Sequence, residues 1–132
     1  MTVLRSLVSV VDDDESVRES LTDLLRVCGF LVQAFSSAED FLASEVVGQT
    51  ECLILDIAMP GMTGPALHQE LRSRRLGIPV VYITARRDET VRPRLLAQGA
   101  VECLFKPFGE AALLDAVRAA LRPPYRRHAG AT

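Results

Sequence analysis

Five short apolar runs recur along this chain and alternate with segments that have helical periodicity. The runs are Leu7–Val11, Leu31–Phe35, Cys52–Leu55, Ile78–Thr84 and Val101–Phe105. Apolar runs of about four to eight residues, bounded by turn residues, are typical of strands buried on both faces. Buried strands that alternate with helices form a parallel sheet with helices on both sides. The pattern therefore predicts an α/β fold made of five βα units.

The segments between these runs carry the spacing and the end signals of helices. The first has apolar residues at helical spacing and a closing glycine: Val17, Leu21, Leu24, Leu25, Cys28 and Gly29. Ser37 is a capping residue and predicts a short helix through about Glu45. Gly64-Pro65 opens a third helix, because proline is tolerated in a first turn. A last helix is expected from about Glu110 to just before Pro123.

Composition limits the classes of protein that this chain can belong to. Its 132 residues are enough for one domain, expected over residues 1–122, with a polar, Pro-led tail or linker stub at 123–132. A net charge of -2 argues against direct nucleic-acid binding by this chain, and no apolar run reaches membrane-spanning length. Cys28, Cys52 and Cys103 lie within apolar runs and are expected to be buried free thiols in a reducing compartment. We therefore expect a cytoplasmic protein with no membrane partner.

Polar residues stand at the carboxyl ends of four of the predicted strands. They are Asp12, Asp13 and Asp14, then Asp56, Thr84 and Lys106. Each alone could be a cap or turn residue, but the carboxyl ends of parallel strands meet at one edge of the sheet. Clustered carboxylates repel one another unless a cation joins them, and oxygen ligands favour Mg²⁺. A hydroxyl and an ammonium nearby suit the oxygens of a phosphoryl group, so Asp56 is either a metal ligand or the nucleophile.

These residues lie in a set of motifs that resembles a known family. The motifs are "VVDDDES", "LILDIAMPGMTG", "PVVYITA" and "GAVECLFKPF", in this order along the chain. Together they resemble the receiver domain of a two-component response regulator, over roughly Val3 to Arg122. Their wording is most similar to the branch that regulates nitrogen fixation and carries a LuxR-type output domain. The resemblance implies a flavodoxin-like, doubly wound (βα)₅ fold with strand order 2-1-3-4-5.

The resemblance also implies a role for each matching residue. Asp56 would accept a phosphoryl group from the phosphohistidine of a sensor histidine kinase, with Thr84 and Lys106 binding the phosphoryl oxygens and Lys106 pairing beforehand with Asp56. Asp13 would hold Mg²⁺ directly and Asp12 through water, with Asp56 and the backbone carbonyl of Ala58 completing the protein ligands.

The same resemblance implies a signalling module that catalyses only its own phosphorylation and slow dephosphorylation. Its output would be transcription regulation, with possible dimerisation through helix four, strand five and helix five. The Lys106-Pro107 peptide is expected to be cis, and Asp14 and Glu15 are expected to start the first helix.

Two positions depart from the family pattern on the surface that usually transmits the signal. Cys103 stands where an aromatic ring is usual, so a ring rotation cannot operate there. Pro93 lies where helix four is expected, which predicts a short helix that begins near Thr90 or later.

Other readings compete with a phosphorylated receiver. A haloacid-dehalogenase-type phosphatase would use the D-x-D pattern of Asp12–Asp14, but it would leave Asp56 without a task and the chain has no room for a cap domain. A flavin carrier of the same topology would need a phosphate-binding loop after the first strand, which is missing. A degenerate receiver that acts only by protein binding is a third alternative.

Overall fold

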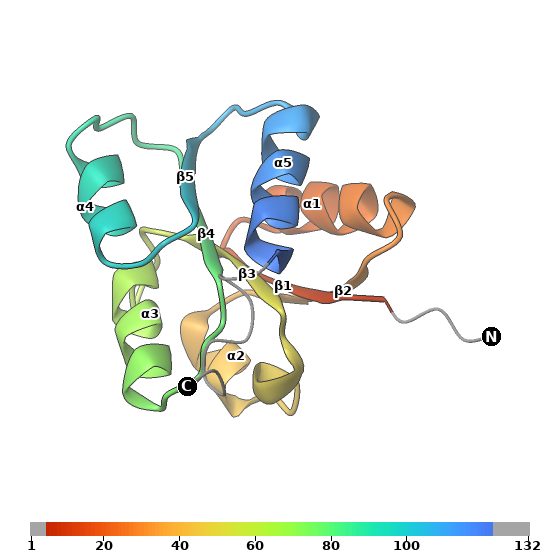
Figure 1. Ribbon diagram of the computed structural model, residues 1–132, viewed down its shortest axis with the longest axis horizontal. Helices are drawn as coiled ribbons and strands as arrows, with labels where there is room; N and C mark the ends of the chain where they lie inside the picture. Colours follow the sequence, from red (N-terminus) through yellow and green to blue (C-terminus); the bar gives the residue numbers. More distant parts are fainter. Residues whose placement is uncertain (1–4, 123–132) are drawn as a thin grey trace.

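A parallel five-stranded sheet forms the centre of the computed structural model, which describes residues 5–122 (Figure 1). The elements in chain order are β1 Leu7–Val11, α1 Glu15–Val27, β2 Leu31–Phe35, α2 Ala38–Ala43, a 3-10 turn η1 Val47–Gln49, β3 Cys52–Asp56, α3 Gly64–Ser73, β4 Val80–Thr84, α4 Val91–Ala97, β5 Glu102–Phe105 and α5 Glu110–Leu121. The strands lie in the order β2-β1-β3-β4-β5, and every neighbouring pair is parallel. The predicted (βα)₅ fold and its strand order are confirmed.

Helices cover both faces of the sheet and divide the apolar core into two parts. On one face α1 and α5 pack Leu25 and Leu113 against the sheet, and on the other α2, α3 and α4 cover it (Figure 1). Successive strand residues alternate between the two cores, so Leu53 and Leu55 face one and Ile54 the other. Burial on both faces explains why the central strands are continuously apolar.

Several boundaries differ by one or more residues from the predicted ones. Helix α2 ends at Ala43, before the expected Glu45, because Ser44 is extended and its hydroxyl donates to the carbonyl of Phe41 at 2.7 Å. The predicted third strand continues by one residue to include Asp56. The predicted tail, 123–132, lies outside the described residues.

The burial predicted for the cysteines is correct for two of the three. Cys52 and Cys103 are buried, and burial raises the pKa of their thiols to about 12 and about 11, so both stay protonated. The prediction is wrong for Cys28, which is exposed. Cys28 is the C-cap that follows the last helical residue of α1, Val27, so it lies beyond the buried helical positions Leu21 and Leu25.

Helix α4 has the short form that Pro93 predicts. It runs from Val91 to Ala97, and Pro93 is its third residue, in the first turn where the missing N–H costs no helical bond. Within residues 5–122, no helix combines the length and the apolar composition needed to span a membrane.

Candidate functional site

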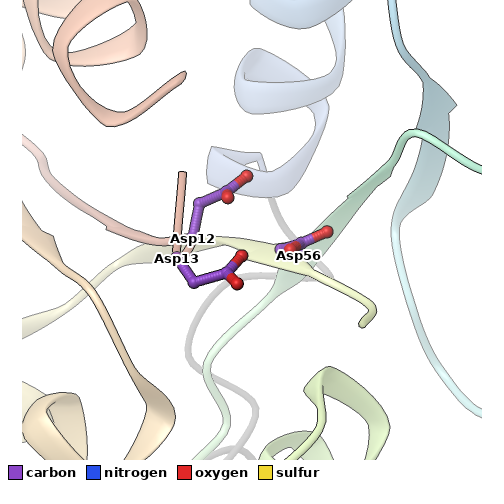
Figure 2. A group of neighbouring side chains, drawn as sticks. All are labelled: Asp12, Asp13 and Asp56. Atoms are coloured by element: carbon purple, nitrogen blue, oxygen red, sulfur yellow. The ribbon is translucent and has the colours of Figure 1, made fainter. Parts of the chain in front are cut away.

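The carboxyl ends of β1 and β3 bring three carboxylates together. Val11 and Leu55 are register partners in the sheet, so Asp12, which follows β1, and Asp56, the last residue of β3, lie side by side at the carboxyl edge of the sheet. Oxygen atoms of Asp12, Asp13 and Asp56 all lie within 4.8 Å of one another (Figure 2). The convergence predicted for these three residues is therefore observed.

Asp12 is fully buried, and hydrogen bonds fix its orientation. Its Oδ1 accepts from the backbone N–H of Asp14 at 2.9 Å, and its Oδ2 accepts from Lys106 Nζ at 3.0 Å. Its backbone carbonyl accepts from Arg18 Nη1 on α1 at 2.7 Å. A buried carboxylate needs such partners, and here a cation supplies one of them.

The surroundings of Asp56 shift the pKa of its carboxyl group upward. Its side chain is nearly buried, and burial, followed by the charges of Asp12 and Asp13, raises its pKa to about 7. Lys106 opposes this shift, but its Nζ lies 4.0 Å from Asp56 Oδ1, farther than from Asp12. Lys106 therefore neutralises the cluster only in part, because its ammonium lies near Asp12 and Asp56.

Thr84 and Lys106 lie on the same rim and are joined through the backbone. The N–H of Lys106 donates to the carbonyl of Thr84 at 2.8 Å, which places the residue after β5 beside the end of β4. Thr84 is buried, and its Oγ1 accepts from the N–H of Arg86 at 3.1 Å. The Lys106-Pro107 peptide is cis, as predicted.

Residues that border the site take the places that the sequence predicts. Asp14 caps α1 by accepting from the N–H groups of Ser16 and Val17, and Glu15 is the first helical residue. Ala58 is exposed, two residues past Asp56 in the β3–α3 loop. Its backbone carbonyl is thus on the loop that leaves the acidic cluster.

The β3–α3 loop folds back on the end of β3 at Gly64. A Cβ added at Gly64 would overlap the carbonyl oxygen of Asp56, so no other residue fits without a shift of the backbone. The N–H of Gly64 also donates to the carbonyl of Ile57 at 2.9 Å. This close approach explains the glycine of the motif in physical terms.

Two residues that touch the site loops were not predicted. Arg18 holds the carbonyl of Asp12, and Glu39 on α2 accepts from the N–H of Met62 at 3.0 Å. Both are charged residues on helix surfaces, so no local pattern distinguishes them from solvated side chains.

The donor set fits Mg²⁺. Three carboxylates within 4.8 Å of one another offer hard oxygen ligands, which Mg²⁺ prefers over nitrogen or sulfur. A divalent cation would also relieve the repulsion by Asp12 and Asp13, which adds to burial in raising the pKa of Asp56. No other group of three or more acidic, histidine or cysteine side chains with this spacing occurs in residues 5–122.

Known proteins are similar to this chain in both amino-acid sequence and fold. Residues 8–118 match the response regulator receiver domain family. Nodulation protein W of Bradyrhizobium diazoefficiens is 43% identical over 123 residues, which are 93% of this chain and 54% of that protein. Transcriptional regulatory protein FixJ of Azorhizobium caulinodans is 40% identical over 114 residues, 86% of this chain and 54% of that protein.

A solved structure gives the same result for the fold. The response regulator StyR superimposes with a TM-score of 0.81 at 46% identity, over 89% of this chain and 60% of that one. This chain spans about half the length of the curated relatives that it matches.

Proposed function

The chain belongs to the response regulator receiver domain family, a family of two-component signalling modules, and from this premise we propose that Asp56 is its phosphoryl acceptor. The observation that carries the proposal is the cluster of Asp12, Asp13 and Asp56 with Lys106 on one rim. A reactive carboxylate on a rigid strand end, next to a cation site, suits in-line attack on phosphorus.

The proposed reaction is transfer from a phosphohistidine of a sensor histidine kinase. A carboxylate oxygen of Asp56 bonds to phosphorus while the P–N bond breaks, and the leaving imidazole nitrogen keeps the electron pair. The product is an aspartyl phosphate, and attack by an in-line water would later release inorganic phosphate and restore Asp56. The protein would thus catalyse only its own phosphorylation and its slow dephosphorylation.

Each site residue has a part in this proposal. Asp13 would bind Mg²⁺ directly, Asp12 through water, and Asp56 and the carbonyl of Ala58 would complete the protein ligands. When bound, Mg²⁺ neutralises negative charge on the transferred group. Lys106 would bind a phosphoryl oxygen from the side where its ammonium now contacts Asp12 and Asp56.

Thr84 would connect the chemistry to the output surface. Its hydroxyl now accepts from the N–H of Arg86, so turning it toward a phosphoryl oxygen would break that bond and free the β4–α4 loop. Cys103 has no aromatic ring that could rotate, and Pro93 keeps α4 short. We therefore propose that the signal passes on through a change in the conformational populations of the β4–α4 loop and α4.

The output domain that this receiver controls is inferred from its relatives. Homologues such as FixJ are transcriptional regulators about twice as long as the matched segment, so we propose that this receiver controls a DNA-binding output domain. Dimerisation through α4, β5 and α5 and a cytoplasmic location are part of the same proposal.

Phosphorylation of Asp56 is the first prediction. Incubation with acetyl phosphate and Mg²⁺ should add one phosphoryl group by mass, and Asp56→Asn should abolish the addition. Asp14→Asn is the matched control, because it removes a neighbouring acid but keeps a side chain able to cap α1.

Three outcomes would contradict the proposal. Labelling of Asp56→Asn, or labelling without Mg²⁺, would reject Asp56 as the acceptor at a metal site. No labelling of the wild-type protein by acetyl phosphate or by a kinase would favour the degenerate receiver. Turnover of a broad phosphomonoester substrate would favour the phosphatase alternative.

A further inference from the structure

Glu39 contacts the loop that follows the proposed acceptor, although the two are distant in the sequence. Its Oε2 accepts from the backbone N–H of Met62 at 3.0 Å, across 23 residues of sequence. Glu39 lies in the first turn of α2, where Ser37 caps the helix by accepting from the N–H of Asp40. The carboxylate is therefore carried by a helix whose start is itself fixed.

The backbone of the loop is shaped around this carboxylate. Gly61 has a φ of 76°, in the left-handed region that favours glycine. A Cβ added at Gly61 would lie 2.7 Å from Glu39 Oε2. The position next to Met62 thus leaves no room for a side chain as long as Glu39 stays in place.

Other contacts hold the two ends of the loop, and Met59 and Met62 pack its middle against the core. At the start, the N–H of Ile57 donates to the carbonyl of Ile83 on β4 at 3.2 Å. At the end, Gly64 bonds back to Ile57, and Thr63 caps α3. Met59 packs in the core, and the bond from Met62 to Glu39 ties the segment after it to α2.

We propose that Glu39 is a positioning residue for the phosphoryl site, holding the β3–α3 loop so that the carbonyl of Ala58 stays available to the metal. The proposal rests on the function proposed above, because it assigns Ala58 to the Mg²⁺ site. Glu39 itself touches neither the acceptor nor the metal. A charged acceptor suits this task, since hydrogen bonds to a carboxylate are shorter and stronger than those between neutral groups.

Amide hydrogen exchange in the Mg²⁺-free protein tests the contact directly. Glu39→Ala should accelerate exchange of the Met62 amide about ten-fold, the factor expected for loss of one such hydrogen bond. Glu39→Gln keeps an oxygen acceptor and should restore much of the protection. Asp40→Asn is the matched control, because it removes the other first-turn acid of α2 and leaves Met62 untouched.

Mg²⁺ titration by calorimetry tests the positioning role. Glu39→Ala should raise the Kd for Mg²⁺ about ten-fold, the lower end of the effect of losing an outer-shell partner of a metal ligand, Glu39→Gln should raise it less, and Asp40→Asn not at all. Gly61→Ala should act in the same direction as Glu39→Ala, because the new Cβ would push the carboxylate away. Circular dichroism would establish that each variant is folded.

Two results would overturn the proposal. Unchanged Met62 exchange in Glu39→Ala would show that the contact does not hold the loop. Faster exchange with an unchanged Kd would show that the loop does not serve the metal. A wild-type protein that binds Mg²⁺ but never accepts a phosphoryl group would instead reject the proposed function and leave the role of Glu39 in metal binding intact.

Discussion

Asp56 on the acidic rim and His68 on the buried face of α3 are both buried ionisable groups, and burial moves their pKa values in opposite directions. It raises the pKa of Asp56 to about 7 and lowers that of His68 to about 4, since burial disfavours the charged form of each. Neighbouring charges add to both shifts: Asp12 and Asp13 for the acid, and Arg72 for the imidazole. The physical cause is shared, but the surroundings of the two groups differ.

His68 has a partner that satisfies its neutral form. Its Nδ1 lies 3.0 Å from the hydroxyl of Tyr82 on β4, and both side chains are buried. Burial also raises the pKa of Tyr82, so the phenol stays protonated. The pair can share a hydrogen bond with no charge on either ring, and it needs no ligand.

The groups that act on Asp56 are charged instead of neutral. Its neighbours are two carboxylates and an ammonium that lies closer to Asp12 than to Asp56. A group such as His68, whose pKa is shifted but whose neutral form has a hydrogen-bond partner, has a structural role. A group such as Asp56, whose pKa is shifted and whose neighbouring like charges are only partly neutralised, favours the binding of a cation. The pair of His68 and Tyr82 therefore contributes to the stability of the fold, whereas Asp56 is available for chemistry.

The largest expected effect is that of acidification on the contribution of His68 to stability, read as the difference between wild type and His68→Leu. Between about pH 6.5 and 4, His68 is protonated in the unfolded chain but stays neutral in the native protein. This group therefore lowers the free energy of unfolding as pH falls. We expect a loss on the order of 2 kcal/mol, reduced from the full shift by partial screening. Urea unfolding at several pH values measures it.

His68→Leu isolates this contribution from that of Asp56. Asp56 acts in the opposite sense, because its native pKa lies above its usual value and protonation below about pH 7 stabilises the fold. Because Asp56 is present in both proteins, its contribution cancels in the difference between the free energies of unfolding of wild type and His68→Leu. Parallel pH curves for the two proteins would show that His68 is not buried as a neutral group.

Removal of the Tyr82 hydroxyl should have a smaller effect at neutral pH. Tyr82→Phe leaves His68 Nδ1 buried without its partner and should lower the free energy of unfolding by about 1–2 kcal/mol. The double variant Tyr82→Phe/His68→Leu is the control, because replacing both polar partners by apolar groups costs less than the sum of the two single losses. Additive losses would mean that the two rings do not interact.

The amino-acid sequence predicts the strands and the rim well, for a clear physical reason. Runs such as Cys52–Leu55 are buried on both faces, and the parallel topology brings Asp12, Asp56, Thr84 and Lys106 to one edge whatever the details of packing. Such features depend on local pattern and on connection rules.

The rest depends on packing between segments that are far apart in the sequence. Tyr82 lies in an apolar run and His68 on a helix. The local sequence around either residue therefore does not indicate that their side chains form a hydrogen bond. Glu39 looks like a solvated first-turn acid until Met62 is placed beside it. The closer approach of Lys106 to Asp12 than to Asp56 is a difference of one side-chain conformation.

The smallest predicted effect concerns the rim and depends on Mg²⁺. In Mg²⁺-free buffer above about pH 7, Asp56→Asn should raise the free energy of unfolding by up to about 1 kcal/mol, because it removes a carboxylate that burial, Asp12 and Asp13 disfavour. The gain should shrink between about pH 7 and 4, because native Asp56 takes up a proton over this range, whereas the unfolded carboxyl, with its usual pKa of 3.8, does so only at lower pH. Saturating Mg²⁺ should reverse the order, since it stabilises the wild type by mass action and the variant has lost one ligand. Asp23→Asn, an exposed acid on α1, controls for net charge and should show neither response. A wild type that stays less stable than Asp56→Asn in Mg²⁺ would mean that the rim holds no cation through Asp56, and the contrast with His68 would then be one of geometry alone.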